Sequence, residues 1–341
     1  MAESPTILVI GPRWVGDMVM AQCLFSALKE LHPSAAIDVL APAWAAPLVA
    51  RMPEIRQQID FPLKPGALEF SSRRRFGRLL RGRYDMAYVL PGSWKSALIP
   101  FFAGIPRRVG NLREMRYGLL TDVVPLAKSM KRRTAQAYFG LAGGGTFRAP
   151  RLSVDTAGQA ALLSRLELDA KGFVALMPGA EFGPAKRWPS ESYAGLARDL
   201  MARGLKVVLL GSRNDSPVTA EIAALAPGAL DLAGKTRLED AVDLIGAARL
   251  AVSNDSGLMH VAAAVGTPFY CYSTATLALP REHAAAQRDA RTGLARPPLL
   301  PLPPEDLPAR PSRLPEDARS RQGRGRRGAS SGHSGDGMTS A

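Results

Sequence analysis

The first half of the chain alternates short apolar runs with longer amphipathic stretches, a pattern that predicts β-strands joined by helices. Residues 6–11 form an apolar run of strand length, and residues 17–31 carry apolar side chains three or four positions apart, which predicts a helix. Further short apolar runs lie at 38–41 and 85–90, and residues 95–103 predict a second helix. This alternation is typical of a parallel sheet with crossover helices.

The second half repeats the pattern. Strands are predicted at 172–177, 205–210 and 249–253, and helices at 190–203 and 256–265, with Ser190 as the N-cap. Two α/β halves in tandem create a cleft between sheet edges, where such folds bind ligands. For the helix predicted at 17–31 in the first half, the predicted inward face consists of Ala21, Leu24, Leu28 and Leu31.

The length of 341 residues suits two domains and a tail. Residues 143–156 lack periodicity, so we expect domains at 1–155 and 156–273. After Tyr270 the chain contains no Val, Ile, Phe, Trp, Lys or Asn, which leaves little apolar surface to offset the entropy of ordering. We therefore expect a disordered tail at 274–341. Because the change falls inside an expected strand, we hypothesise that the reading frame is shifted there.

The formal net charge of +14 favours anionic partners, which include nucleic acid, an anionic membrane and a phosphorylated substrate. The densest basic cluster is either a solvated helix face or a surface that meets a membrane or substrate. It comprises Arg73, Arg74, Arg75, Arg78, Arg81 and Arg83. No apolar run approaches the roughly 20 residues of a membrane span, and the two cysteines provide neither a disulfide framework nor a metal cluster.

A glycine turn, Gly11-Pro-Arg-Trp-Val-Gly-Asp17, follows the first predicted strand. It is not a dinucleotide fingerprint, because Arg13 stands where the second glycine belongs. It is not a P-loop either, because Asp17 replaces the lysine and would repel phosphates. Two readings of Asp17 remain: a helix N-cap, or a general base beside Gly16, where a substrate can approach the backbone closely.

Two later segments carry further candidate chemistry. Residues 177–189 form a Gly/Pro-rich loop before a helix, and Lys186 and Arg187 make it either a diphosphate site or a basic surface loop. In residues 253–268, the predicted helix N-terminus at Gly257 and Leu258 suits an anion. The remaining candidates of that segment are Asp255, which can accept hydrogen bonds from sugar hydroxyls, and His260, which is either a core residue or faces the site.

Taken together, these motifs resemble the bacterial ADP-heptose–lipopolysaccharide heptosyltransferases of glycosyltransferase family 9, and within them the type II enzymes. The resemblance runs from about Ile7 to Pro268 and includes residues 95–106 and 114–118. It implies a GT-B fold, in which two Rossmann-like doubly wound domains face a cleft. The resemblance assigns catalysis to Asp17 and acceptor-side positions to Arg13, Trp14 and Gly16. It assigns donor binding to Gly179, Glu181, Lys186, Asp255, Ser256, Gly257, Leu258 and His260.

The resemblance also implies an activity: inverting, metal-independent transfer of L-glycero-D-manno-heptose from ADP-heptose to the first heptose of the lipopolysaccharide inner core. The expected partners are ADP-heptose, a heptosyl-Kdo2-lipid A type acceptor and, peripherally, the cytoplasmic face of the inner membrane. No cofactor, metal or nucleic acid is expected; the chain lacks the interleaved aromatics of a nucleic-acid module. Because the tail departs from the family after Pro268, the alternative is an inactive protein or one that only binds the donor.

Overall fold

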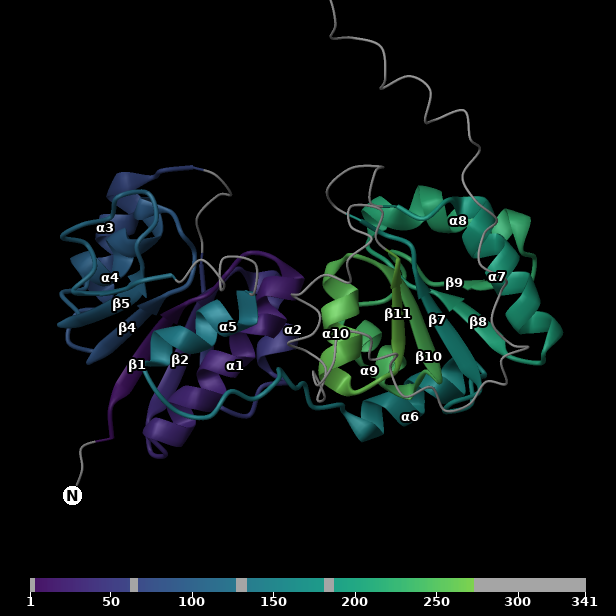
Figure 1. Ribbon diagram of the computed structural model, residues 1–341, viewed down its shortest axis with the longest axis horizontal. Coiled ribbons are helices and arrows are strands. Elements are labelled where there is room, and N and C mark those ends of the chain that lie inside the picture. Colours follow the sequence, from purple (N-terminus) through teal and green to yellow (C-terminus); the bar gives the residue numbers. More distant parts are fainter. Residues whose placement is uncertain (1–3, 62–66, 127–133, 181–186, 273–341) are drawn as a thin grey trace, which may run out of the picture. The chain divides into compact units, whose positions relative to one another are not determined.

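The computed structural model describes residues 4–61, 67–126, 134–180 and 187–272. They form two parallel β-sheets flanked by helices (Figure 1), and both sheets belong to one compact unit. The division after residue 155 stays a prediction. The predicted tail at 274–341 lies outside the described residues.

The first sheet has the strand order β3-β2-β1-β4-β5-β6, with every neighbouring pair parallel. Its strands are β1 (Thr6–Ile10), β2 (Ala36–Ala41), β3 (Ile55–Asp60), β4 (Met86–Val89), β5 (Arg107–Asn111) and β6 (Asp122–Val124). Its helices are α1 (Val15–Leu31), α2 (Ala46–Val49), α3 (Phe70–Leu79), α4 (Leu98–Phe102) and α5 (Thr134–Phe139). Among the described residues it also has the 3₁₀ turns η1 (Ala43–Ala45), η2 (Trp94–Ala97) and η4 (Gly140–Ala142).

The second sheet has the order β11-β10-β7-β8-β9, again parallel throughout. Its strands are β7 (Phe173–Met177), β8 (Lys206–Leu209), β9 (Leu230–Asp231), β10 (Leu250–Asn254) and β11 (Phe269–Tyr272). The accompanying helices are α6 (Thr156–Arg165), α7 (Ser190–Ala202), η6 (Arg213–Asp215), α8 (Ser216–Leu225), α9 (Leu238–Ala247) and α10 (Gly257–Val265).

Both sheets are doubly wound, and this topology locates their functional edges. The strand order changes direction between β1 and β4 in the first sheet and between β7 and β10 in the second. Loops at the carboxyl ends of strands at such a switch point form the ligand crevice of open α/β sheets. The turn after β1, the loop after β7 and the turn after β10 occupy these positions, and they are the three segments that the sequence singled out.

Helix α1 differs in two respects from the sequence prediction. It begins at Val15 with Trp14 as its N-cap, so Asp17 is the third helical residue and the N-cap reading of Asp17 is wrong. Leu31 was expected to face inward, but it is 40% exposed. The helix contacts both α5 and α10, and it shares a core cluster with β1 and β2. Its buried residues therefore encircle its first part rather than following one stripe.

Helix α7 begins as predicted at Ser190, but the capping prediction is wrong. Pro189 occupies the N-cap position, and Ser190 is the first helical residue. Its hydroxyl instead donates a hydrogen bond to the Glu221 carboxylate of α8 at 2.7 Å. No helix in the described ranges combines the length and apolar character that a membrane span needs.

Candidate active site

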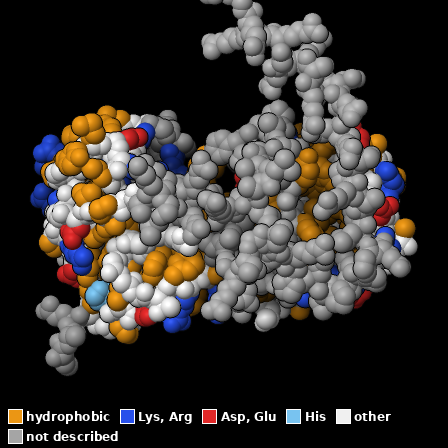
Figure 2. All heavy atoms as spheres, viewed as in Figure 1, with side chains coloured by type: hydrophobic (Ala, Val, Ile, Leu, Met, Phe, Trp, Pro, Cys, Tyr) orange, Lys and Arg blue, Asp and Glu red, His pale blue; other side chains and the backbone are white. Residues whose placement is uncertain are grey.

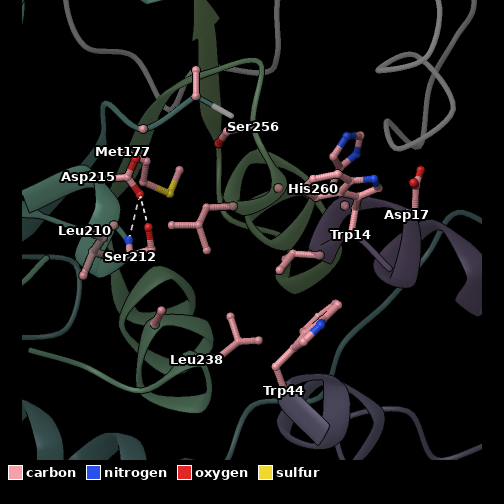
Figure 3. Close-up of a pocket in the computed structure, with 18 of the residues that line it drawn as sticks. Trp14, Asp17, Trp44, Met177, Leu210, Ser212, Asp215, Leu238, Ser256 and His260 are labelled. Carbon is pink, nitrogen blue, oxygen red and sulfur yellow. Dashed lines mark hydrogen bonds between the residues drawn. The ribbon is translucent and has the colours of Figure 1, made fainter. Parts of the chain in front are cut away.

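Residues from both sheets line one cavity of about 700 Å³ (Figure 3). The first sheet contributes the turn after β1, the first turns of α1, and Trp44 of η1. The second contributes the loops after β7 and β8, the start of α9 and the start of α10. The cavity therefore lies where the carboxyl-end loops of the two sheets meet, as expected for a ligand site of this topology.

The carboxylate of Asp17 lies at the first-sheet side of this cavity. Its side chain is half-buried, and no hydrogen bond from it caps α1. Burial raises the pKa of the Asp17 carboxyl above its usual value, because a poorly solvated site disfavours the charged form. A carboxylate with a raised pKa is a better proton acceptor, which is what a general base requires.

Helices α1 and α10 meet at their N-termini through two glycines. A Cβ on Gly16 would lie 2.6 Å from the His260 ring, and a Cβ on Gly257 would lie 2.9 Å from the Val15 Cβ. Neither position has room for a side chain as the helices stand. The close approach brings two helix N-termini, each with partial positive charge, to the same cavity, and in Figure 3 His260 lies beside Trp14.

Asn254, at the end of β10, holds the second-sheet loops together. Its buried amide donates to the Pro178 carbonyl at 2.6 Å. Its carbonyl oxygen accepts from the Trp188 backbone N–H at 3.0 Å and from the Tyr193 hydroxyl at 3.2 Å. The side chain thus fixes both ends of the loop that contains residues 181–186. Sequence reasoning assigned Asn254 no site role; its place at a strand end, among polar residues, was the available signal.

Sequence reasoning missed a carboxylate in the cavity wall. Asp215 of η6 accepts hydrogen bonds from the Ser212 backbone N–H at 2.8 Å and hydroxyl at 2.7 Å (Figure 3). A Cβ on Gly179 would lie 2.6 Å from its carboxyl carbon, and one on Gly211 would lie 2.8 Å from its Cβ. The Ser-x-x-Asp spacing after a predicted strand, a capping box, could have identified this turn.

Sequence reasoning also missed apolar residues of the cavity wall, among them Trp44 and Leu238. Figure 3 shows them side by side at one end of the cavity, away from His260 and Asp17. Trp44 follows β2 and is 37% exposed. Leu238 is the first residue of α9. Nothing in the sequence connects two residues that are almost 200 positions apart.

The structure brings ten of the twelve predicted site residues to this one cavity. They are Arg13, Trp14, Gly16, Asp17, Gly179, Asp255, Ser256, Gly257, Leu258 and His260. Lys186 and Glu181 lie outside the described residues. The individual roles assigned to all twelve stay predictions.

Comparison with known proteins places this site in a family. The profile of glycosyltransferase family 9 (heptosyltransferase) matches residues 73–274, more than half of the chain. The chain belongs to this family. Among family 9 proteins, lipopolysaccharide heptosyltransferase 2 of Salmonella typhimurium is 49% identical over 280 residues, which cover 77% of this chain and 80% of the relative. The Escherichia coli K12 protein of the same name is 48% identical with the same coverage.

Solved structures agree with the family 9 assignment. The structure of Escherichia coli ADP-heptose LPS heptosyltransferase II matches with a TM-score of 0.72 at 45% identity, over 78% of this chain and 84% of that chain. An Escherichia coli heptosyltransferase determined with ADP has a TM-score of 0.60 at 18% identity over 78% and 86%, so it shares the fold. The predicted α/β fold of two Rossmann-like sheets and the glycosyltransferase class are confirmed.

Proposed function

We propose that the chain transfers L-glycero-D-manno-heptose from ADP-heptose to the first heptose of the lipopolysaccharide inner core, at the cytoplasmic face of the inner membrane. One observation carries the proposal: in a family 9 chain, Asp17 and the N-terminus of α10 line the same cavity. That arrangement provides a proton acceptor on one side of the reacting centre and a positive helix end on the other.

The proposed reaction is an inverting substitution at the anomeric carbon. The acceptor hydroxyl attacks that carbon, and its proton passes to the Asp17 carboxylate as the new C–O bond forms. The bond to the diphosphate breaks at the same carbon, and ADP leaves with the electron pair. The backbone N–H groups at the start of α10 would donate hydrogen bonds to the diphosphate and so stabilise the negative charge that develops on it. We propose that this contribution, together with Lys186, makes the reaction independent of a metal ion.

The proposal is tested by incubating the full chain with ADP-heptose and a core acceptor that ends in a single heptose, and following ADP release and the mass of the acceptor. Gain of one heptose by the acceptor supports it. Donor binding without transfer would point instead to a donor-binding protein, and the absence of both would refute the proposal. Binding of ADP-heptose is measured separately by calorimetry, so that these results are told apart.

The pH dependence of transfer follows from the environment of Asp17. A base must be ionised to act, and burial raises the pKa of this carboxyl. We therefore expect kcat to fall as the pH is lowered through that raised pKa, at a pH above the ordinary aspartate value of about 3.9, and to be flat above it. Measuring kcat across the acid range at saturating substrates checks this. An acid limb at the ordinary value would contradict the assigned role.

Trp44 gives a prediction about the nucleotide end of the cavity. If the diphosphate lies at α10, the adenine of the donor reaches the apolar end, where Trp44 and Leu238 line the wall. We expect Trp44→Ala to weaken ADP binding about tenfold, because stacking of a base on an aromatic ring contributes about 1–3 kcal/mol, and Trp44→Phe to preserve most of it. Trp94→Ala is the matched control, because Trp94 is similarly exposed at 39% and does not line the cavity. Equal ADP affinities of the Trp44→Ala and Trp94→Ala variants, measured by calorimetry, would contradict the prediction.

A further inference from the structure

The helix pair α3 and α4 carries a surface that the cavity does not use. Residues 70, 74 and 78 recur at intervals of four, so Phe70, Arg74 and Arg78 lie along one side of α3. Phe70 is 47% exposed, and both arginines are exposed. Figure 2 shows hydrophobic side chains gathered on the molecular surface in the region of α3 and α4, with Lys and Arg side chains at its border.

Two side-chain contacts place this stripe beside α4. The Phe70 ring meets the Phe102 ring edge-on, with centroids 5.4 Å apart. At the other end of the stripe, the Arg81 guanidinium donates to the Phe102 carbonyl at 3.3 Å. Phe102 in turn meets the Phe101 ring at 5.4 Å, and Phe101 is 41% exposed. We call Phe70, Arg74, Arg78, Arg81, Phe101 and Phe102 the α3–α4 face.

The charge and packing of the α3–α4 face indicate which kind of partner it binds. Residues 70–84 contain six arginines and no Asp or Glu, and residues 98–108 contain no acidic residue either. The nearest acidic residue along α3 is Glu69, which precedes the helix. Gly77 lets α3 approach α4 closely, since a Cβ there would lie 2.7 Å from the Ile99 carbonyl oxygen. The aromatic rings therefore sit on two closely packed helices with cationic side chains along them.

We propose that the α3–α4 face docks on the surface of a bilayer that contains anionic phospholipids. Aromatic side chains enter the interfacial region of a bilayer, and arginines beside them contact the phosphates of the headgroups. A nucleic-acid duplex would use the arginines but would leave the exposed phenylalanines without a function. The inference extends the proposed function, which places the acceptor in a membrane, by naming the face that meets that membrane.

Vesicle co-sedimentation of the full chain, without ADP-heptose, tests the proposal independently of heptose transfer. We expect binding to vesicles of phosphatidylcholine with a third phosphatidylglycerol, and far weaker binding to pure phosphatidylcholine. Each basic residue near an anionic surface contributes about fivefold to the affinity, so Arg74→Gln with Arg78→Gln should weaken binding about 25-fold. The matched control removes the same charge elsewhere, at exposed Arg165 and Arg249, and should change it less than twofold.

A second variant pair tests the aromatic contribution. Phe70→Ser with Phe101→Ser should lower vesicle affinity about tenfold while the salt dependence of binding stays the same, since no charge is lost. Circular dichroism of each variant checks that it is folded. Transfer to a water-soluble core acceptor should be unchanged in both double variants, because none of these residues lines the cavity.

Three results would overturn the docking proposal. The first is an equal loss of vesicle binding in the Arg74/Arg78 variant and the Arg165/Arg249 control. The second is displacement from vesicles by millimolar glycerol phosphate, which would indicate a site for free phosphate. The third is tighter binding to a random DNA duplex than to the anionic vesicles. A chain that binds vesicles as expected but transfers no heptose would leave the docking proposal standing and refute the proposed function.

Discussion

Asp17→Asn is expected to lower the rate of heptose transfer by a factor of about 10²–10⁴, the usual contribution of a general base, while the affinity for ADP changes little. Asparagine keeps the size and hydrogen-bonding shape of the side chain but cannot accept the proton of the acceptor hydroxyl. In the proposed mechanism the second sheet holds the donor, because the α10 N-terminus and the loops after β7 and β8 line the cavity. Steady-state kcat and calorimetric ADP affinity, measured on the same preparation, check both halves of this prediction.

A purely structural role of Asp17 predicts a different outcome, so the measurements distinguish it from the general-base role. As an acidic residue in the first turn of α1, Asp17 interacts favourably with the helix dipole, worth about 0.3–1 kcal/mol. If that were its only function, Asp17→Asn would leave kcat within a few-fold of wild type. Its effect on the melting temperature would be small, because relief of the desolvation that raises the pKa of this carboxyl offsets the lost interaction with the helix dipole. Asp199→Asn, at an exposed position of α7 that does not line the cavity, is the control for the same chemical change.

The fold followed from the sequence because strand and helix periodicities are local. The alternation of apolar runs predicted both parallel sheets, and the glycine turn after the first strand predicted the start of α1 to within two residues. The turns at switch points could be predicted for the same reason, because polar and glycine residues gather where parallel strands end. In these segments neighbouring residues alone set the structure.

The errors arose where distant elements decide the environment. Leu31 follows the helical spacing, yet it is exposed at the C-terminal end of α1. Taken alone, Ser190 is a favourable N-cap residue, but Pro189 occupies that position. The Glu221 carboxylate of α8 accepts a hydrogen bond from the Ser190 hydroxyl instead. The cavity could not be predicted fully for the same reason. Trp44 and Leu238 belong to elements of different sheets, and they line one cavity only because those elements meet in the fold.

A second substitution with a large expected effect is Gly257→Ala, at the point where the N-termini of α1 and α10 meet. A Cβ at this position would lie 2.9 Å from the Val15 Cβ and 3.3 Å from the Gly16 backbone nitrogen. The backbone of α1 cannot rotate away as a side chain can, so Gly257→Ala must separate the two helix N-termini. We expect a loss of about 1–3 kcal/mol in stability from the overpacking. We also expect a fall of about 10²-fold in kcat/KM, the scale associated with a displacement of about 1 Å at a reacting centre.

The control and the rescue for Gly257→Ala come from the same chain. Gly195 lies in α7, and a Cβ there meets only the end of the Arg198 side chain at 4.0 Å, so Gly195→Ala should gain about 0.5–1 kcal/mol from its helix position and leave kcat/KM unchanged. Adding Val15→Gly to Gly257→Ala removes the side chain that the new methyl group meets. Activity of this double variant should recover several-fold over Gly257→Ala, so the two changes are not additive. Strict additivity in urea unfolding and in kcat/KM would mean that contact between α1 and α10 does not set the geometry of the site.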